Sequence, residues 1–275
     1  MAIKTILLHM APDENRHNRF DVALRLAREH GAHLEIAYMT SPASMPAAIT
    51  GRGASHSFIA ESTRIAEEKA DKIMAEVTAR VEESGVEWNW EVLEGDHNEL
   101  LAERSHFADL MIVSEHHGVT LEGYVGLHMP EEMLMTSICP VLVLPKNRKI
   151  ETVGERVLVA WKDTKEAARA VRESLPMLQA AKNVFVLTCD RPHHRFEAGK
   201  DIVAFLTRHG VSVEPVSDIA DGNDVGPIIL SYAADVKADL LVMGAYGHSR
   251  WREIVFGGVT HHVLKNMKLP LLMAH

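Results

Sequence analysis

The residues with the clearest chemical meaning are four glycines near the end of the sequence, spaced Gly-x2-Gly-x9-Gly-Gly: Gly244, Gly247, Gly257 and Gly258. They follow a continuous apolar run at 240–243, which is typical of a strand buried on both faces of a parallel sheet. Glycine permits a tight turn and a close approach of the backbone to a ligand. Bare amides at a strand end and at a helix start form a cradle for a phosphate group. The spacing therefore predicts a phosphate-binding loop.

This glycine pattern lies between an Ala-Asp-Leu-Leu-Val strand and a final Leu-Pro-Leu-Leu-Met strand. It resembles the nucleotide-binding signature of the universal stress protein family, Gly-x2-Gly-x9-Gly-(Ser/Thr). The match covers the first three glycines, but Gly258 stands at the Ser/Thr position. Its backbone donor remains, whereas the hydroxyl that would reach a terminal phosphate is missing. Thr260 either supplies a hydroxyl in its place or only caps the helix.

The resemblance implies a ligand and a role. The ligand is ATP or another adenine nucleotide, with or without Mg²⁺, and the role is binding and signalling in stress tolerance with at most slow ATP hydrolysis. We identify no catalytic residue, because no positioned general base and no metal-holding carboxylate pair lies in sequence beside the glycines.

Further site residues follow from the resemblance at the ends of two other strands. The family usually carries an Asp after strand one, where this chain has Lys162 and then Asp163. Asp163 either takes over that contact or caps the next helix together with Glu166, and Lys162 either lies in solvent or neutralises phosphate. The end of strand two, at Thr188, is where the family holds the adenine edge with backbone groups. The predicted nucleotide-binding residues are Trp161, Lys162, Asp163, Thr188, Gly244, Gly247, His248, Gly257, Gly258, Val259 and Thr260.

The elements that must position these residues alternate between strand and helix, and the pattern occurs twice. The predicted strands are 3–10, 34–39, 87–93, 110–113, 141–144, 156–161, 184–189, 211–216, 240–243 and 271–273. The predicted helices are 21–30, 59–81, 98–107, 165–180, 201–209, 227–236 and a short one from 258. Residues 40–57 are predicted as a loop, and the polar, basic stretch 146–154 as a linker.

An internal repeat supports two copies of one unit. Ala108-Asp109-Leu110 recurs as Ala238-Asp239-Leu240, and Cys139-Pro140 matches Leu269-Pro270 at the same spacing. The sequence thus predicts two doubly wound α/β domains with parallel sheets, at 1–148 and 153–275. The resemblance implies the tandem form of the family, with an adenine nucleotide alpha hydrolase-like fold, strand order 3-2-1-4-5, and a site where that order reverses.

The first copy departs from the glycine pattern. Ser114 stands in place of the first glycine, His117 in place of the second, and Glu115 would put negative charge where phosphates should lie. We expect this copy not to bind nucleotide as the family does. Met129, Met133 and Met135 either pack in its core or line an altered cavity for an apolar ligand.

Composition and charge limit the classes of partner that the chain is expected to bind. A formal net charge of −9 argues against nucleic acid and anionic membranes, and no apolar run is long enough to span a bilayer. Two cysteines, Cys139 and Cys189, form no disulfide framework, and with no signal-like N-terminus we expect a cytoplasmic protein. Among seventeen histidines the best metal candidates are His116, His117 and His128, but their spacing matches no metal motif, so no metal site is predicted.

Three other functions stay open. They are an ATP-using transferase or pyrophosphatase on a related fold, a scaffold that binds no nucleotide, and a binder of another small molecule such as a lipid or cyclic nucleotide. Family members pair through their fifth strands. Here 141–144 and 271–273 are expected to pair within one chain, which then forms a homodimer or stays single.

Overall fold

The computed structural model describes residues 2–40, 54–114, 129–146, 148–190, 199–219, 225–245 and 258–275. The strands are β1 (Thr5–Met10), β2 (His33–Thr40), β3 (Trp88–Glu94), β4 (Leu110–Ser114), β5 (Val141–Leu144), β6 (Arg156–Trp161), β7 (Asn183–Asp190), β8 (Val213–Ile219), β9 (Leu240–Gly244) and β10 (Leu271–Ala274). The helices are α1 (Arg16–His30), α2 (Ala54–Ser84), α3 (His97–Arg104), the 3₁₀ turn η2 (Ser105–Phe107), α4 (Met129–Thr136), α5 (Lys165–Ala180), α6 (Lys200–Arg208), α7 (Val225–Asp235) and α8 (Val259–Asn266).

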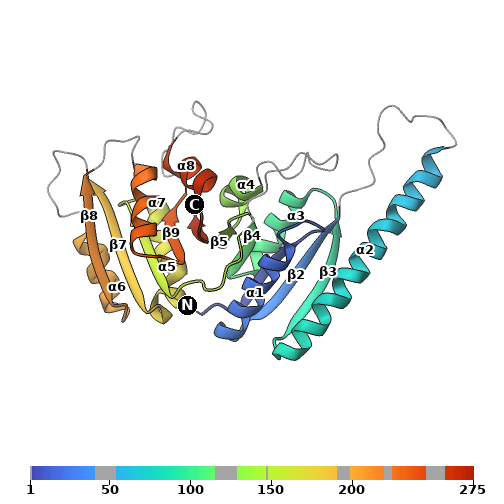
Figure 1. The fold of residues 1–275 in the computed structure, drawn as a ribbon, viewed down its shortest axis with the longest axis horizontal. Helices are drawn as coiled ribbons and strands as arrows, with labels where there is room; N and C mark the ends of the chain where they lie inside the picture. The colour runs from blue at the N-terminus through green and yellow to red at the C-terminus, as the bar shows by residue number, and fades with distance from the viewer. Residues whose placement is uncertain are drawn as a thin grey trace.

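The strands form one sheet in the order β3-β2-β1-β4-β5-β10-β9-β6-β7-β8. Each half of the chain therefore has the order 3-2-1-4-5, as the resemblance implies, and the second half is laid out in reverse. Every pairing within a half is parallel, whereas β5 and β10 pair antiparallel at the centre, with Leu142 opposite Leu272. The fifth strands thus cover each other's edges (Figure 1).

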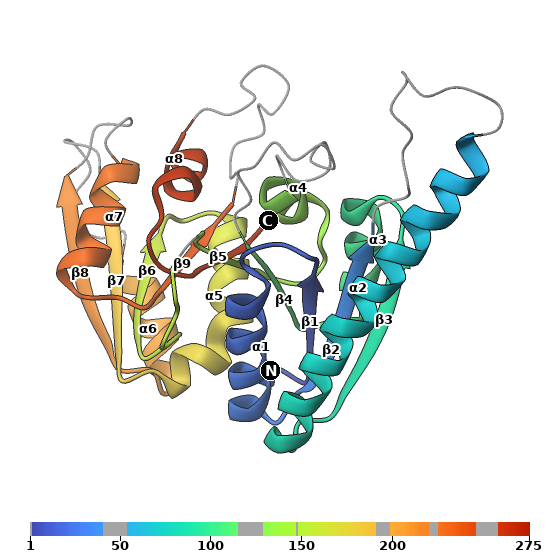
Figure 2. The same cartoon turned by 45° about the vertical axis from the view of Figure 1, so that its right-hand side comes forward.

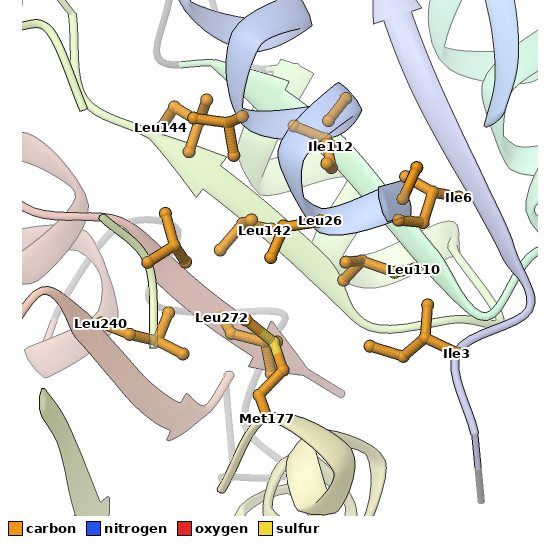
Figure 3. Close-up of a cluster of buried hydrophobic side chains, with 14 of the residues drawn as sticks. Ile3, Ile6, Leu26, Leu110, Ile112, Leu142, Leu144, Met177, Leu240 and Leu272 are labelled. Carbon is orange, nitrogen blue, oxygen red and sulfur yellow. The ribbon is translucent and has the colours of Figure 1, made fainter. Parts of the chain in front are cut away.

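Helices cover both faces of the sheet. Side chains of α1, α2, α5 and α6 pack on one face, and those of α3, α4, α7 and α8 on the other. The core on the face covered by α1, α2, α5 and α6 continues across the central seam, because it includes Leu142 and Leu144 of β5 as well as Leu272 of β10 and Met177 of α5 (Figure 3). The two halves consequently share buried apolar surface as well as the sheet.

One acidic residue braces the start of each half. The Asp109 carboxylate accepts hydrogen bonds from the backbone N–H groups of Lys4 and Thr5, at 2.8 and 2.9 Å. Asp239 accepts from three amides at the start of the second half, those of residues 154–156, at 2.8–3.1 Å. The repeated Ala-Asp-Leu of the sequence is thus a repeated support for the first strand of each half.

The stretch predicted as a linker is fixed on α1. Ile150 and Val153 are buried. Asn18 holds the Arg148 carbonyl and the Ile150 amide, at 2.9 and 3.0 Å, and Arg25 donates to the Glu151 carbonyl at 2.6 Å. The connection therefore packs as part of the first half.

Two helices, α1 and α2, each begin five residues earlier than predicted. α1 starts at Arg16 instead of residue 21, and its first turns carry the buried side chains of Arg19 and Phe20 inward. α2 starts at Ala54, inside the range predicted as a loop. Among the side chains of α2 that the structure describes, the first buried one is that of Ala70, and the N-terminal part of the helix projects beyond the body (Figures 1 and 2).

Candidate functional site

The candidate site lies where the strand order of the second half reverses. β6 lies between β7 and β9, so the chain leaves β6 to one side and returns on the other. In open α/β sheets such a reversal opens a crevice at the carboxyl ends of the two strands involved. Trp161 ends β6 and Gly244 ends β9. Trp161 is half-buried, and Lys162 and Asp163 beyond it are exposed.

Gly244 allows α5 to touch the end of β9. A Cβ at this position would lie 2.5 Å from the Ala167 backbone nitrogen and 2.7 Å from the Glu166 carbonyl carbon. Contacts that short do not occur with real Cβ atoms, so any other residue would push the first turn of α5 away. The first glycine of the pattern is therefore required by close packing at the crevice.

The N-cap of α5 is Thr164. Its hydroxyl accepts from the Ala167 amide at 3.3 Å, and its backbone is extended as an N-cap requires. The alternative in which Asp163 caps this helix is wrong, because the helix begins one residue later than that pairing assumed. Asp163 is left as an exposed residue between β6 and its cap.

Glu166 brings a buried carboxylate to the first turn of α5. Burial alone would raise the pKa of Glu166, but its own backbone N–H, the Thr164 hydroxyl and Lys165 together hold that pKa below its usual value. The Lys165 ammonium lies 3.5 Å from the carboxylate. This negative charge beside the crevice is thus already compensated. The sequence indicates Glu166 only as a partner in a helix cap.

The other end of the glycine pattern opens α8. Gly258 is the N-cap residue, with φ +117° and ψ −170°, a conformation that favours glycine, and its cap has no side-chain hydrogen bond. Val259 and Thr260 form the first turn, and Thr260 is buried. Since Gly258 takes the cap position, Thr260 does not cap the helix. Gly247, His248 and Gly257 lie outside the described residues.

Thr188 lies next to Trp161 in register across β7 and β6. It is buried, and its hydroxyl donates to the Val216 carbonyl at 3.5 Å, toward β8. Its side chain is therefore directed away from β6. A contact from this position to a ligand would come from the backbone, as the resemblance implies.

The corresponding crevice of the first half is closed by a buried guanidinium. Arg19 of α1 is 1% exposed and donates to the His9 carbonyl at 2.9 Å and to the Ser114 hydroxyl at 2.5 Å. The same side chain pairs with both oxygens of Asp13, at 3.0 and 2.5 Å. Because His9 lies near the end of β1 and Ser114 ends β4, this network fills the reversal point of the first half.

The methionines of the first half do not line a common cavity. Met129 and Met133 are buried in the core, whereas Met135 is 43% exposed. Cys139 is also buried, and burial raises the pKa of its thiol to about 11, so it is an inert packing residue. His116, His117 and His128 lie outside the described residues. Among the residues that the structure does describe, no three His, Cys, Asp or Glu side chains form a metal-binding group.

A family model matches the chain twice. The model described as the universal stress protein family covers residues 2–145 and again 154–275. The chain belongs to the universal stress protein family. It is a tandem member, with one match in each half of the sheet.

Several universal stress proteins are similar along the whole chain. One from Synechocystis sp. is 24% identical, over 98% of this chain and 99% of its own. The crystal structure of a universal stress protein from Archaeoglobus fulgidus has a TM-score of 0.78 at 15% identity, covering 98% of this chain and 95% of that one. A putative universal stress protein from Pseudomonas aeruginosa has a TM-score of 0.62 at 18% identity, covering 98% and 92%. These likenesses support the fold. In the described part of this universal stress protein, no helix is long and apolar enough to span a membrane.

Proposed function

We propose that this universal stress protein binds an adenine nucleotide in its second half, between the carboxyl ends of β6 and β9. The observation that carries the proposal is the pair of glycines at the described ends of the pattern. Gly244 brings backbone into close contact at the reversal point, and Gly258 opens α8 in a conformation that favours glycine. Amides at a helix start favour an anionic ligand such as phosphate.

The proposed site residues have different parts in binding. Gly244, Gly247, Gly257, Gly258, Val259 and Thr260 surround the phosphates, and His248 lies beside them. Trp161, Lys162 and Asp163 meet the nucleoside from β6, and Thr188 meets it through the backbone of β7. We further propose 1–148 and 153–275 as the two domains, with only the second binding ATP or a related nucleotide, with or without Mg²⁺.

A scaffold without nucleotide is the second candidate function. It is favoured by Lys162, which is exposed at the position where the family usually has an acidic residue. It is also favoured by Gly258, which lacks the hydroxyl of the family pattern. Under this alternative the second half, like the first, would act only through its surface.

Calorimetric titration distinguishes the two functions. ATP, ADP and AMP are titrated with and without Mg²⁺ into the intact chain and into a Gly247→Trp variant. The matched control is His117→Trp, which places the same side chain at the equivalent position of the first half. We expect micromolar binding by the intact chain and the control, and none by Gly247→Trp. No binding by the intact, folded chain would favour the scaffold.

A further inference from the structure

We propose that His275 positions the root of the glycine loop, and that Arg169 ties this support to the first half. The inference rests on the proposed function, because the loop matters for binding only if the second half holds a nucleotide. It concerns residues that directly follow β9 and β10, at the same edge of the sheet as the candidate site.

Both backbone groups of Ala245 are held. Ala245 follows Gly244 and is completely buried. Its N–H donates to the Ala274 carbonyl at 2.9 Å, and its carbonyl lies 3.1 Å from Nδ1 of His275. Ala245 is the last described residue before the glycine loop, so these two hydrogen bonds fix the backbone from which the loop begins.

The chemistry of this contact fixes the histidine. A carbonyl oxygen only accepts, so Nδ1 of His275 must carry the hydrogen. The hydrogen bond to Ala245 therefore requires the form of the ring in which Nδ1 is protonated, and it fixes the orientation of the ring.

Arg169 holds His275 in turn. This residue lies in the second turn of α5, and its Nη1 donates to the His275 carbonyl at 2.8 Å. Its Nε donates to Glu173 at 2.7 Å, and its Nη2 donates to the Ile138 carbonyl. One guanidinium thus joins α5, the end of β10 and a residue of the first half.

The antiparallel seam makes this link possible. Because β5 and β10 run in opposite directions, the start of β5 lies beside the end of β10. Ile138 precedes β5 and so lies close to His275. The first half, whose own crevice is filled by Arg19, in this way supports the loop of the second half through Ile138, Arg169, His275 and Ala245.

The first half offers a matched control. Asn18 of α1 is the counterpart of Arg169 of α5. The two residues are 151 positions apart, which is also the offset between the first strands of the two halves. It also holds the segment that follows a fifth strand, but this segment is the connection at Arg148 and Ile150. Asn18→Ala therefore removes an equivalent support that does not reach the glycine loop.

The test compares His275→Ala, His275→Asn, Arg169→Ala and Asn18→Ala with the intact chain. Calorimetry gives the dissociation constant for ATP or ADP, and hydrogen exchange without nucleotide follows the Ala245 amide. Since one hydrogen bond is lost, we expect His275→Ala to weaken binding about three- to tenfold and to speed exchange at Ala245. His275→Asn, whose amide can donate to Ala245, should largely restore both. Arg169→Ala should weaken binding, and Asn18→Ala should change neither.

The outcomes separate this inference from the proposed function. If the intact chain binds and His275→Ala binds equally well, the positioning role is overturned while nucleotide binding stands. If the intact chain does not bind, the proposed function fails, and the positioning role of His275 is then judged from hydrogen exchange alone. Unchanged exchange at the Ala245 amide in His275→Ala would overturn that role. If Asn18→Ala weakens binding as much as Arg169→Ala does, the effect is general loosening and the inference fails.

Discussion

The two halves of this universal stress protein share a strand order, but different groups pack at the reversal point of each half. In the first half, Arg19 bridges Asp13 and Ser114 inside the crevice. In the second half, Gly244 stands at the place of Ser114, and the backbone of α5 packs directly against it. A side-chain network fills the reversal point of the first half, whereas in the second half the backbone of α5 packs against a residue without a side chain. The two halves share one scaffold, and under the proposed function a few side chains at the reversal point decide which half holds an anion.

The largest expected effect is at the buried network of the first half. Arg19→Ala removes the guanidinium that donates to the Asp13 carboxylate, the Ser114 hydroxyl and the His9 carbonyl. Removing one partner of a buried ion pair costs about 3–5 kcal/mol, so we expect a large fall in the midpoint of urea unfolding.

Arg16→Ala is the control for Arg19→Ala. It lies one turn earlier on the same helix, is partly exposed and pairs with Glu76 at 3.7 Å. An exposed ion pair of this kind contributes about 0–1 kcal/mol. Equal losses in the two variants would show that the network does not hold the first crevice, and the contrast between the halves would be lost.

The next effect is at the close contact of the second half. Gly244→Ala places a methyl group against the Ala167 backbone, and overpacking of this kind costs about 1–3 kcal/mol. We expect a lower urea midpoint and a shifted first turn of α5, seen as faster hydrogen exchange at the Ala167 amide.

Ser114→Ala is the matched change in the first half. It keeps the Cβ and loses only the hydroxyl that accepts from Arg19, for about 1 kcal/mol. Faster exchange at Ala167 should therefore appear in Gly244→Ala alone. A stable Gly244→Ala variant with unchanged exchange would mean that this glycine serves only to form a turn and is not required for packing against α5.

The sequence predicts much of this fold, but it predicts little of the difference between the contacts at the two reversal points. Apolar runs and the repeated Ala-Asp-Leu predict the strands, because burial between two helix layers leaves a continuous apolar signal. Arg19 gives no such signal: its partner Ser114 lies 95 residues away, and an arginine in a helix is ordinarily a surface charge. The sequence predicts the glycines, but it does not predict the contact of Gly244 with α5, which depends on how the helix packs.

The ends of the helices show the same difference between features set by neighbouring residues and features set by contacts between distant parts of the chain. Gly31 ends α1 as predicted, in a left-handed conformation with φ +57°. The start of α2 is missed because residues 54–58, Ala-Ser-His-Ser-Phe, show no apolar periodicity. The linker reads as polar and basic, yet Asn18 and Arg25 fix its backbone, and backbone contacts leave no trace in composition.

The smallest expected effect concerns a buried histidine of the first half. Burial lowers the pKa of His97 below its usual value, although the Asp96 carboxylate and a hydrogen bond to the Thr40 backbone act to raise it. The unfolded chain therefore binds this proton more readily, and the stability from neutral His97 is complete above about pH 6.5. That stability is lost as the pH falls through the lower pKa of the folded state. The second half has Pro227 at the equivalent position, so this loss belongs to the first half.

Urea midpoints measured at about pH 5 and about pH 7.5 test this assignment. His97→Asn, which keeps an N–H for the Thr40 carbonyl, should show a smaller loss on acidification than the intact chain. His30→Asn is the comparison variant, because burial also lowers the pKa of His30. Each substitution should reduce the loss of stability on acidification, and in the double variant the two reductions should add if the sites act independently. Hydrogen exchange locates the effect: on acidification, amides of α3 should open before those of α7. Equal opening of both helices would place the acid sensitivity in the shared sheet, and His97 would no longer distinguish the two halves.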